Sequence, residues 1–264
     1  APGGFSNRNA SVGAYGDPVL EMIIAVFALL FSINFAMYFL LLCRRFREVL
    51  QSDELRFFLV VVGLSTAVIA FNIRHLYQGP LQCLRYAFFQ VSSIISTTGF
   101  ATADFCLWPQ FSQIIFILLM LCGACAGSTG GGIKTTTFFV LLSGIYSAAT
   151  NHSERAFHNA IPKDAFRKAS VISMLAVFLV MTASYLMLIF DPQLSLRDVL
   201  FEMISAFSTS GLSTGITPQL SAQSRILSII MMYIGRLGPL TVASLWYFTI
   251  GERVRYPEGT IAIG

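Results

Sequence analysis

The stretch FQVSSIISTTGFAT, at residues 89–102, returns as FEMISAFSTSGLST at residues 201–214, 112 positions later and without a gap. The identical pairs are Phe89 and Phe201, Ser93 and Ser205, Ser96 and Ser208, Thr97 and Thr209, Gly99 and Gly211, and Thr102 and Thr214. In each copy an amphipathic segment ends in a Thr-Thr-Gly or Thr-Ser-Gly turn, and an apolar segment follows. Self-similarity at a fixed spacing indicates a repeated structural unit.

The composition excludes a water-soluble globule and a disordered chain. Of the 264 residues, 55% are hydrophobic and 11% are charged, whereas soluble domains carry about 25% charged residues. The net charge is +4, but no basic stripe with interleaved aromatic residues indicates DNA or RNA binding. Five cysteines and three histidines lack the spacing of a disulfide framework or a metal site. We therefore expect no nucleic-acid partner and no bound cofactor.

Five apolar segments stand out as candidate membrane spans, for which a bilayer needs about 20 residues. They cover residues 19–42, 57–71, 111–142 with an interruption, 171–190, and 226–250 with an interruption. Shorter segments rich in Ser, Thr and Gly, at residues 84–105 and 196–216, lie between them. These segments are expected to enter the membrane and return on the same side, as re-entrant helices followed by a turn. The sequence thus predicts an all-α membrane protein.

The positions of the basic residues predict the orientation. With the amino end outside, the inner segments hold ten Lys and Arg residues and the outer segments hold five. Because basic residues are enriched in cytoplasmic loops, we expect the amino end of this chain to be outside and the carboxyl end to be cytoplasmic.

The glycine turns that end the two re-entrant segments have a specific chemistry. Glycine adopts a positive φ without steric cost, so a strand through Gly99 or Gly211 can direct successive carbonyl oxygens at one axis. A ring of carbonyl oxygens can replace the hydration shell of an alkali cation. The alternative, that each motif is an ordinary loop turn, is weakened by the recurrence at a fixed spacing.

At these residues the chain resembles the Trk/Ktr/HKT superfamily of potassium transporters. The Gly-Gly-Phe-Ser sequence at residues 3–6 resembles the end of the second ion filter of that superfamily, and residues 96–100 and 208–212 resemble the third and fourth. The resemblance implies units of span, pore helix and span, of potassium-channel type, around a pseudo-fourfold pore. It implies that residues 1–50 end the second unit, residues 51–150 form the third and residues 151–264 form the fourth. The filter residues would be Gly4, Thr97, Thr98, Gly99, Phe100, Thr209, Ser210, Gly211 and Leu212.

The loop GACAGSTGGGIK, at residues 123–134, resembles the gating loop of the same family. Its five glycines interrupt a membrane helix, because each costs up to about 1 kcal/mol relative to alanine. A mobile plug beneath the filter is one interpretation, and close helix packing through small residues is the other. A phosphate-binding loop is disfavoured because Ile133 separates Gly132 from Lys134. The gate residues would be Gly123, Gly127, Ser128, Gly130, Gly131, Gly132, Lys134 and Arg236.

Lys134 and Arg236 are the two basic residues expected within membrane segments, where each costs roughly 2.5–3.5 kcal/mol if it faces lipid. Lys134 could extend to the interface. The resemblance places Arg236 just beneath the filter, where its charge weakens ion binding. The competing interpretation is a structural ion pair between Arg236 and Glu202. Pro239 is expected to kink the last span.

The function implied by the resemblance is potassium uptake across the plasma membrane, namely the inner membrane of a bacterium, and not enzymatic catalysis. The implied ligands are K⁺ at the filter carbonyls and, as a coupling ion, Na⁺. The implied partners are membrane lipid, a second copy in a homodimer, and a cytoplasmic ring of nucleotide-binding regulatory subunits, which residues 152–168 and 256–264 would contact. Because two complete filter motifs and the end of a third are present, we expect this chain to be the carboxyl-terminal portion of a longer subunit. The alternatives are an intramembrane serine hydrolase using Ser128 or Ser210, and a non-conducting structural subunit.

Overall fold

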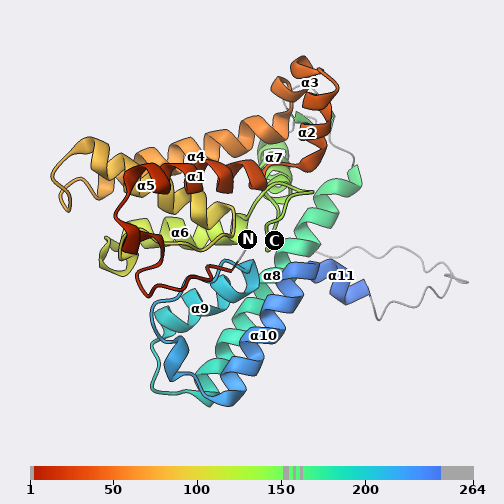
Figure 1. Cartoon of the computed structure of the whole chain (residues 1–264). Coiled ribbons are helices and arrows are strands. Elements are labelled where there is room, and N and C mark those ends of the chain that lie inside the picture. The colour runs from red at the N-terminus through yellow and green to blue at the C-terminus, as the bar shows by residue number, and fades with distance from the viewer. Residues whose placement is uncertain (1–2, 151–154, 157–158, 161–162, 245–264) are drawn as a thin grey trace, which may run out of the picture.

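The computed structural model describes residues 3–150, 155–156, 159–160 and 163–244. Two groups of helices account for most of it (Figure 1). One contains α4 (Asp53–Asn72), α5 (Pro80–Ile95) and α6 (Gln110–Cys122), and the other contains α8 (Lys163–Phe190), α9 (Leu196–Ser208) and α10 (Ala222–Leu237). In each group the middle helix packs against the helices on both sides of it in the sequence. The two groups are therefore built alike, as the 112-residue repeat predicts.

The re-entrant helices expected at residues 84–96 and 196–208 are α5 and α9. Helix α5 begins four residues earlier than expected, because Pro80 occupies its first position, where the missing proline N–H costs nothing. Helix α9 begins after Ser195, whose hydroxyl accepts a hydrogen bond from the N–H of Asp198, the usual helix N-cap.

The segment expected to be one span, residues 19–42, is broken. Helices α1 (Pro18–Ser32) and α2 (Phe35–Leu42) meet at an angle of 92°. Ile33 is extended, and the side chain of Asn34 accepts a hydrogen bond from the N–H of Ala36. Asn34 thus caps a new helix instead of continuing the old one, and this is the physical reason for the bend.

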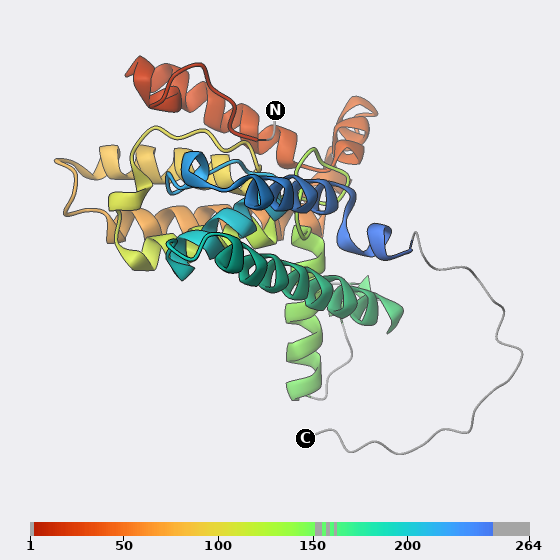
Figure 2. The same ribbon diagram turned by 90° about the horizontal axis from the view of Figure 1, so that it is seen from below.

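Two other expected interruptions are confirmed. Helix α6 ends at Cys122, and α7 (Thr135–Thr150) follows the glycine-rich stretch; Figure 2 shows α7 projecting away from the other helices. Helix α10 ends at Leu237 with Gly238 as its C-cap, and the short α11 (Pro239–Ser244) begins at the proline. In the described part of the chain, α4 and residues 165–190 of α8 are each long and apolar enough to cross a membrane, and α1 with α2 qualifies as a bent pair.

The short elements connect these helices. They are the 3₁₀ turns η1 (Ser11–Tyr15), η2 (Phe105–Leu107) and η3 (Thr217–Gln219), helix α3 (Phe46–Leu50), and the paired two-residue strands β1 (Arg155–Ala156) and β2 (Asn159–Ala160).

The core lies between the two groups of helices. Phe105 stacks on Phe201 with ring centroids 5.6 Å apart, so the loop after α5 packs on α9. By contrast, α1, α4 and α8 expose many large apolar side chains, such as Phe27, Leu64 and Phe178. Apolar exposure of this extent is typical of a surface that contacts lipid.

Candidate functional site

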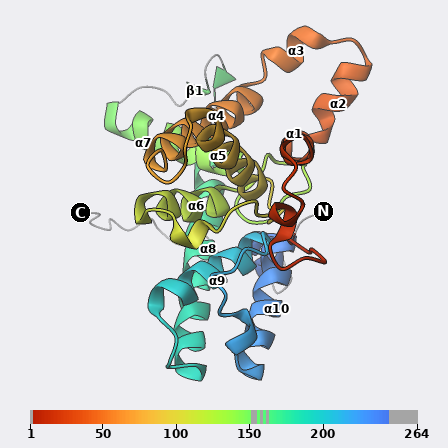
Figure 3. The ribbon, with the colours of Figure 1, turned by 60° about the vertical axis from the view of Figure 1, so that its left-hand side comes forward.

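Three short segments that contain the predicted turn glycines converge between the two groups of helices. We call residues 3–6, 97–100 and 209–212 the glycine segments. Figure 3 shows the amino-terminal chain running beside α9 and α10 before α1 packs along α5. Gly4, Gly99 and Gly211 have φ values of 65°, 76° and 77°. The sequence expectation that these glycines adopt a positive φ is therefore correct.

Two threonines, each two positions before a turn glycine, share an unusual backbone conformation. Thr97 has a φ of 57° and Thr209 a φ of 58°. A left-handed conformation is rare for a β-branched residue, and it occurs here twice, at positions related by the repeat. The left-handed threonine follows the end of α5 and of α9, and there the backbone turns back toward the side from which the helix came.

The glycine segments touch one another through their backbones. A Cβ atom on Gly99 would lie 1.7 Å from the carbonyl oxygen of Ser210, and one on Gly211 would lie 2.1 Å from that of Gly3. The N–H groups of Gly3 and Gly4 donate hydrogen bonds to the carbonyl oxygens of Thr97 and Thr98. In this arrangement the oxygens of Thr97 and Thr98 are bonded to the neighbouring segment, whereas the sequence analysis expected them to face an axis. The three glycine segments are therefore in direct contact through their backbones.

The other predicted filter side chains anchor these segments. Thr98 Oγ1 lies 2.7 Å from Ser96 Oγ, and Ser210 Oγ lies 3.0 Å from Ser205 Oγ. Phe100 packs against a small apolar cluster formed by Val12, Ala25 and Phe89. Leu212 is buried in the main core.

Cavities adjoin the glycine segments. One of about 780 Å³ extends from Gly4, Gly99 and Gly211 to Arg8 and Asp104. Another, of about 610 Å³, is lined by Gly4 and Thr209 and reaches Glu202 and Arg236.

The glycine-rich loop, residues 123–134, lies directly against the ends of α5 and α9. The N–H of Gly131 donates to Thr97 Oγ1 at 3.3 Å, and a Cβ on Gly131 would lie 2.4 Å from Thr209 Oγ1. The Oγ1 atom of Thr209 is buried and has no hydrogen-bond partner among the described residues. Gly131 thus contacts both left-handed threonines, in a position that a larger residue could not occupy.

One side of the loop is held by the bend between α1 and α2. The N–H of Cys125 donates to the carbonyl oxygen of Ser32, and that of Phe35 donates to the carbonyl oxygen of Gly127. Thr129 Oγ1 donates to the carbonyl oxygen of Phe31. The carbonyl oxygens of Phe31 and Ser32 have no partner within α1 because the helix ends there. The break in the first span therefore creates the binding surface for the loop.

The opposite side of the loop is held by α10. The N–H of Gly132 donates to the carbonyl oxygen of Gly235, and the guanidinium of Arg236 donates to that of Thr129. Glu202 instead accepts a hydrogen bond from Thr217. The alternative ion pair between Arg236 and Glu202 is therefore wrong: among the described residues, ion pairs join only Arg45 to Glu48 and Arg85 to Glu21.

Contacts within the loop involve most of the remaining predicted gate residues. Lys134 is half-buried, and its ammonium group donates to the carbonyl oxygen of Gly130, so it does not extend to an interface. A Cβ on Gly130 would lie 2.7 Å from the Cβ of Ala124, and one on Gly123 would lie 2.6 Å from the carbonyl oxygen of Ile133. Gly127 has a φ of 69° and approaches Asn34. The loop is tightly folded on itself as well as tethered.

Glu54 is a contact residue that the sequence analysis missed. Its Oε1 atom accepts a hydrogen bond from the N–H of Ala126 at 3.0 Å, and its Oε2 atom accepts one from the amide of Asn34 at 3.4 Å. Glu54 lies in the first turn of α4, where an acidic residue ordinarily only complements the helix dipole. No local signal distinguishes it from such a residue.

Neither candidate nucleophile has a catalytic environment. Ser128 Oγ donates to the carbonyl oxygen of Cys125, and Ser210 Oγ contacts Ser205 and the sulfur of Met120. A serine nucleophile requires an adjacent general base, and none of these partners is one. The part of the chain that the structure describes also contains no group of three or more His, Cys, Asp and Glu residues that could hold a metal ion.

Comparison with known proteins matches residues 1–248 to the model of the TrkH family, described as cation transport proteins. Ktr system potassium uptake protein B from Bacillus subtilis (strain 168) is 29% identical over 271 aligned positions, which cover 99% of this chain and 60% of that protein. The protein of the same name from Vibrio alginolyticus is 36% identical over 182 positions, covering 67% of this chain and 39% of that protein.

Among solved structures, the crystal structure of the potassium transporter TrkH from Vibrio parahaemolyticus superimposes with a TM-score of 0.79 at 22% identity. The match covers 92% of this chain and 55% of that one, and it shows the same membrane fold. The chain spans about 40–60% of the length of these three proteins.

Proposed function

The chain belongs to the TrkH family of cation transport proteins, and on that premise we propose that it forms part of a pore through which potassium ions cross a membrane. The observation that carries the proposal is the position of Gly131, which contacts both Thr97 and Thr209 at the base of the converging glycine segments. A filter needs an ordered ring of carbonyl oxygens, and a gate needs an obstruction next to that ring. The relatives named above are potassium uptake proteins, which favours K⁺ as the ion.

We propose that the glycine segments are parts of the ion filter. Their residues Gly4, Thr97–Phe100 and Thr209–Leu212 would contribute carbonyl oxygens that replace the hydration shell of K⁺. In a ring of four units a further segment would lie between residues 3–6 and residues 209–212, where Gly3 and Gly211 now touch, and it would move the three glycine segments apart. The carboxyl ends of α5 and α9, with their partial negative charge, point at the same region and favour a cation there.

We propose that the glycine-rich loop is the gate. It lies against the base of the glycine segments. It is held mainly by single hydrogen bonds to Phe31, Ser32, Glu54 and Arg236, and each bond is worth only about 0.5–1.5 kcal/mol net. A modest shift of α2 or α10 could therefore release it. Arg236 would also weaken ion binding beneath the filter by charge repulsion.

The assembly follows from the same proposal. Residues 1–50, 51–150 and 151–264 would belong to successive units of a pseudo-fourfold pore, in a homodimer embedded in the plasma membrane of a bacterium. The amino end of this segment would be outside and the carboxyl end cytoplasmic, facing a ring of nucleotide-binding regulatory subunits. Na⁺ would be a coupling ion. Of the surfaces expected to contact the ring, residues 256–264 and much of 152–168 lie outside the described residues.

The test is potassium uptake by a transport-deficient cell that expresses the full-length subunit. Uptake above the empty-vector control, lost in Gly99→Asp and Gly211→Asp, is the expected result. If the normal subunit restores no uptake while present in the membrane, the chain belongs to a non-conducting structural subunit. Deleting residues 126–130 should raise the leak current, and a deletion with normal gating would contradict the gate assignment.

A further inference from the structure

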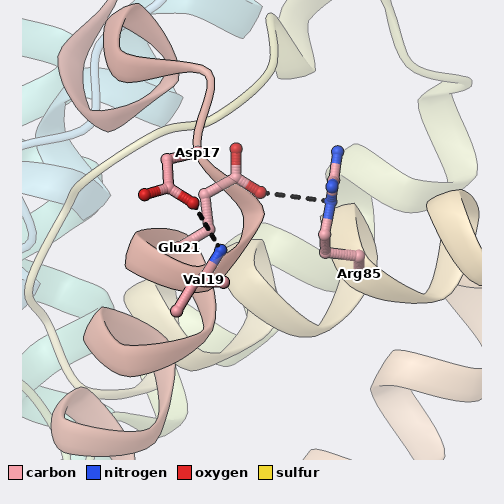
Figure 4. Close-up of polar contacts among 4 residues, drawn as sticks. All are labelled: Asp17, Val19, Glu21 and Arg85. Carbon is pink, nitrogen blue, oxygen red and sulfur yellow. Dashed lines mark hydrogen bonds and ion pairs between the residues drawn. The ribbon is translucent and has the colours of Figure 1, made fainter.

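An ion pair joins the helix after one glycine segment to the re-entrant helix before the next. Arg85 in α5 and Glu21 in α1 approach to 3.2 Å between Nε and Oε2, as Figure 4 shows. The side chain of Glu21 is 4% exposed and that of Arg85 is 25% exposed. The Arg85 guanidinium also lies 4.9 Å from the ring centroid of Tyr86. The arginine is thus held in place on two sides.

The same contact recurs 112 residues later, at the spacing of the repeat. Arg197 in α9 occupies the position equivalent to Arg85, and its guanidinium donates a hydrogen bond to Oε1 of Gln113 in α6. Glu21 is the fourth residue of α1 and Gln113 is the fourth residue of α6. Each arginine therefore reaches back to the same position on the helix that follows the preceding glycine segment.

Gln113 connects this second contact to the loop that leaves the glycine segment at residues 97–100. Its side chain is nearly buried, with 8% exposure, and its Nε2 atom donates to the carbonyl oxygens of Cys106 and Trp108. Arg197 thus binds a side chain that is already fixed by the loop of the neighbouring unit.

The re-entrant helices connect the arginines to the glycine segments, because hydrogen bonds join each segment to the end of its helix. The N–H groups of Thr98 and Gly99 donate to the carbonyl oxygen of Ser93 in α5, and the N–H of Ser210 donates to that of Ser205 in α9. Arg85 is separated from Ile95, the last residue of α5, by about 15 Å of helix, at about 1.5 Å per residue. A tilt of either helix at its arginine therefore displaces the glycine segment at its other end.

We propose that Arg85 and Arg197 are positioning residues that clamp each re-entrant helix to the preceding unit and thereby set the spacing between neighbouring glycine segments. This inference rests on the proposed function, because the spacing of the segments determines which ion fits between their carbonyl oxygens. The two clamps differ in charge, since the first pairs two ions and the second pairs an ion with a neutral amide.

The test compares K⁺ and Na⁺ uptake by cells expressing the full-length subunit with Arg85→Ala, Arg197→Ala or the control Arg74→Ala. Arg74 carries the same charge but lies over the ring of Phe71, in the connection after α4. We expect each clamp variant to lower the ratio of K⁺ to Na⁺ uptake by about 2- to 150-fold, the range that coupling between neighbouring residues gives. The control should keep the normal ratio.

A charge exchange separates positioning from a general loss of folding. The double variant Glu21→Arg with Arg85→Glu restores opposite charges, whereas Glu21→Arg or Arg85→Glu alone places like charges together. At equal amounts of membrane protein, we expect the double variant to recover much of the K⁺ to Na⁺ uptake ratio that either of these single variants loses. Normal ratios in both arginine variants, or a double variant no better than the single ones, would overturn the clamp and leave potassium uptake by the normal subunit intact. Absence of uptake by the normal subunit would overturn the proposed function and the clamp together.

Discussion

The backbone N–H of Gly131 donates a hydrogen bond to Oγ1 of Thr97, and the same glycine lies against Oγ1 of Thr209. The glycine-rich loop is therefore in contact with the base of two glycine segments that are 112 residues apart in the sequence.

Replacing Gly131 with alanine should destabilise the contact between the glycine-rich loop and the two glycine segments. The new methyl group would lie 2.4 Å from Thr209 Oγ1 and 2.8 Å from the carbonyl oxygen of Ser208, and such overpacking costs about 1–3 kcal/mol. We expect an increased leak current in Gly131→Ala, measured by electrophysiology on the reconstituted full-length protein. Gly63→Ala is the control, because nothing lies within 4 Å of its added Cβ. A normal leak in Gly131→Ala would argue against a closed gate at this position.

Glu54 should affect the position of the same glycine-rich loop, from the side of α4. Glu54→Ala removes both acceptors and leaves the N–H of Ala126 unpaired, at a cost of about 1–3 kcal/mol, whereas Glu54→Gln keeps one acceptor oxygen. We expect the leak to increase in the order normal protein, Glu54→Gln, Glu54→Ala. Glu48→Ala, which removes an exposed ion pair with Arg45, should behave as the normal protein. Equal currents in all four proteins would exclude a role for Glu54 in holding the loop.

Gly99 and Gly211 should tolerate no side chain. Alanine there would adopt a left-handed conformation, at about 1–2 kcal/mol, and its Cβ would overlap the carbonyl oxygen of Ser210 or Gly3. We expect Gly99→Ala and Gly211→Ala to abolish selective K⁺ uptake. Gly16→Ala is a matched control for the backbone strain alone, because Gly16 has a φ of 61° and nothing lies within 4 Å of its added Cβ. If Gly16→Ala were equally inactive, contact between the glycine segments would not be the cause.

Asp191, in the connection between α8 and α9, should make the folding stability of the protein fall as the pH is lowered. Its Oδ2 atom accepts hydrogen bonds from the N–H and hydroxyl of Ser221, and hydrogen bonds from Ser224 and Ser221 hold the pKa of this carboxyl below its ordinary value of 3.8. A depressed pKa contributes stability that is complete above the ordinary value and is lost as the pH falls through the lowered one.

The measurement is the melting temperature of the purified protein as the pH is lowered. We expect Asp191→Asn to melt at a lower temperature than the normal protein at neutral pH and to lose less stability in acid. Asp53→Asn, which removes a carboxylate at the beginning of α4, is the control and should keep the normal acid dependence. An unchanged acid dependence in Asp191→Asn would show that this carboxyl contributes nothing.

The sequence by itself determined the features that depend on local chemistry. The repeat located α5 and α9, glycine identified the positions of positive φ at Gly99 and Gly211, and Pro239 marked the end of α10. Five glycines also identified the loop that separates α6 from α7. Each of these signals acts within a few residues, through backbone sterics or a missing hydrogen-bond donor, so it can be read without knowing what lies nearby in space.

Only the tertiary structure decided what these elements contact. Glu54 bonds a backbone group 72 residues away, and Arg236 bonds one 107 residues away, while Arg85 and Arg197 read from the sequence as two outer charges among five. The bend at Asn34 was missed because residues 19–42 form one apolar segment in the sequence. The carbonyl oxygens of Phe31 and Ser32, which the bend leaves free, bind the glycine-rich loop only in the folded protein. Such contacts depend on the shape of several helices packed together, and no local pattern of residues encodes that shape.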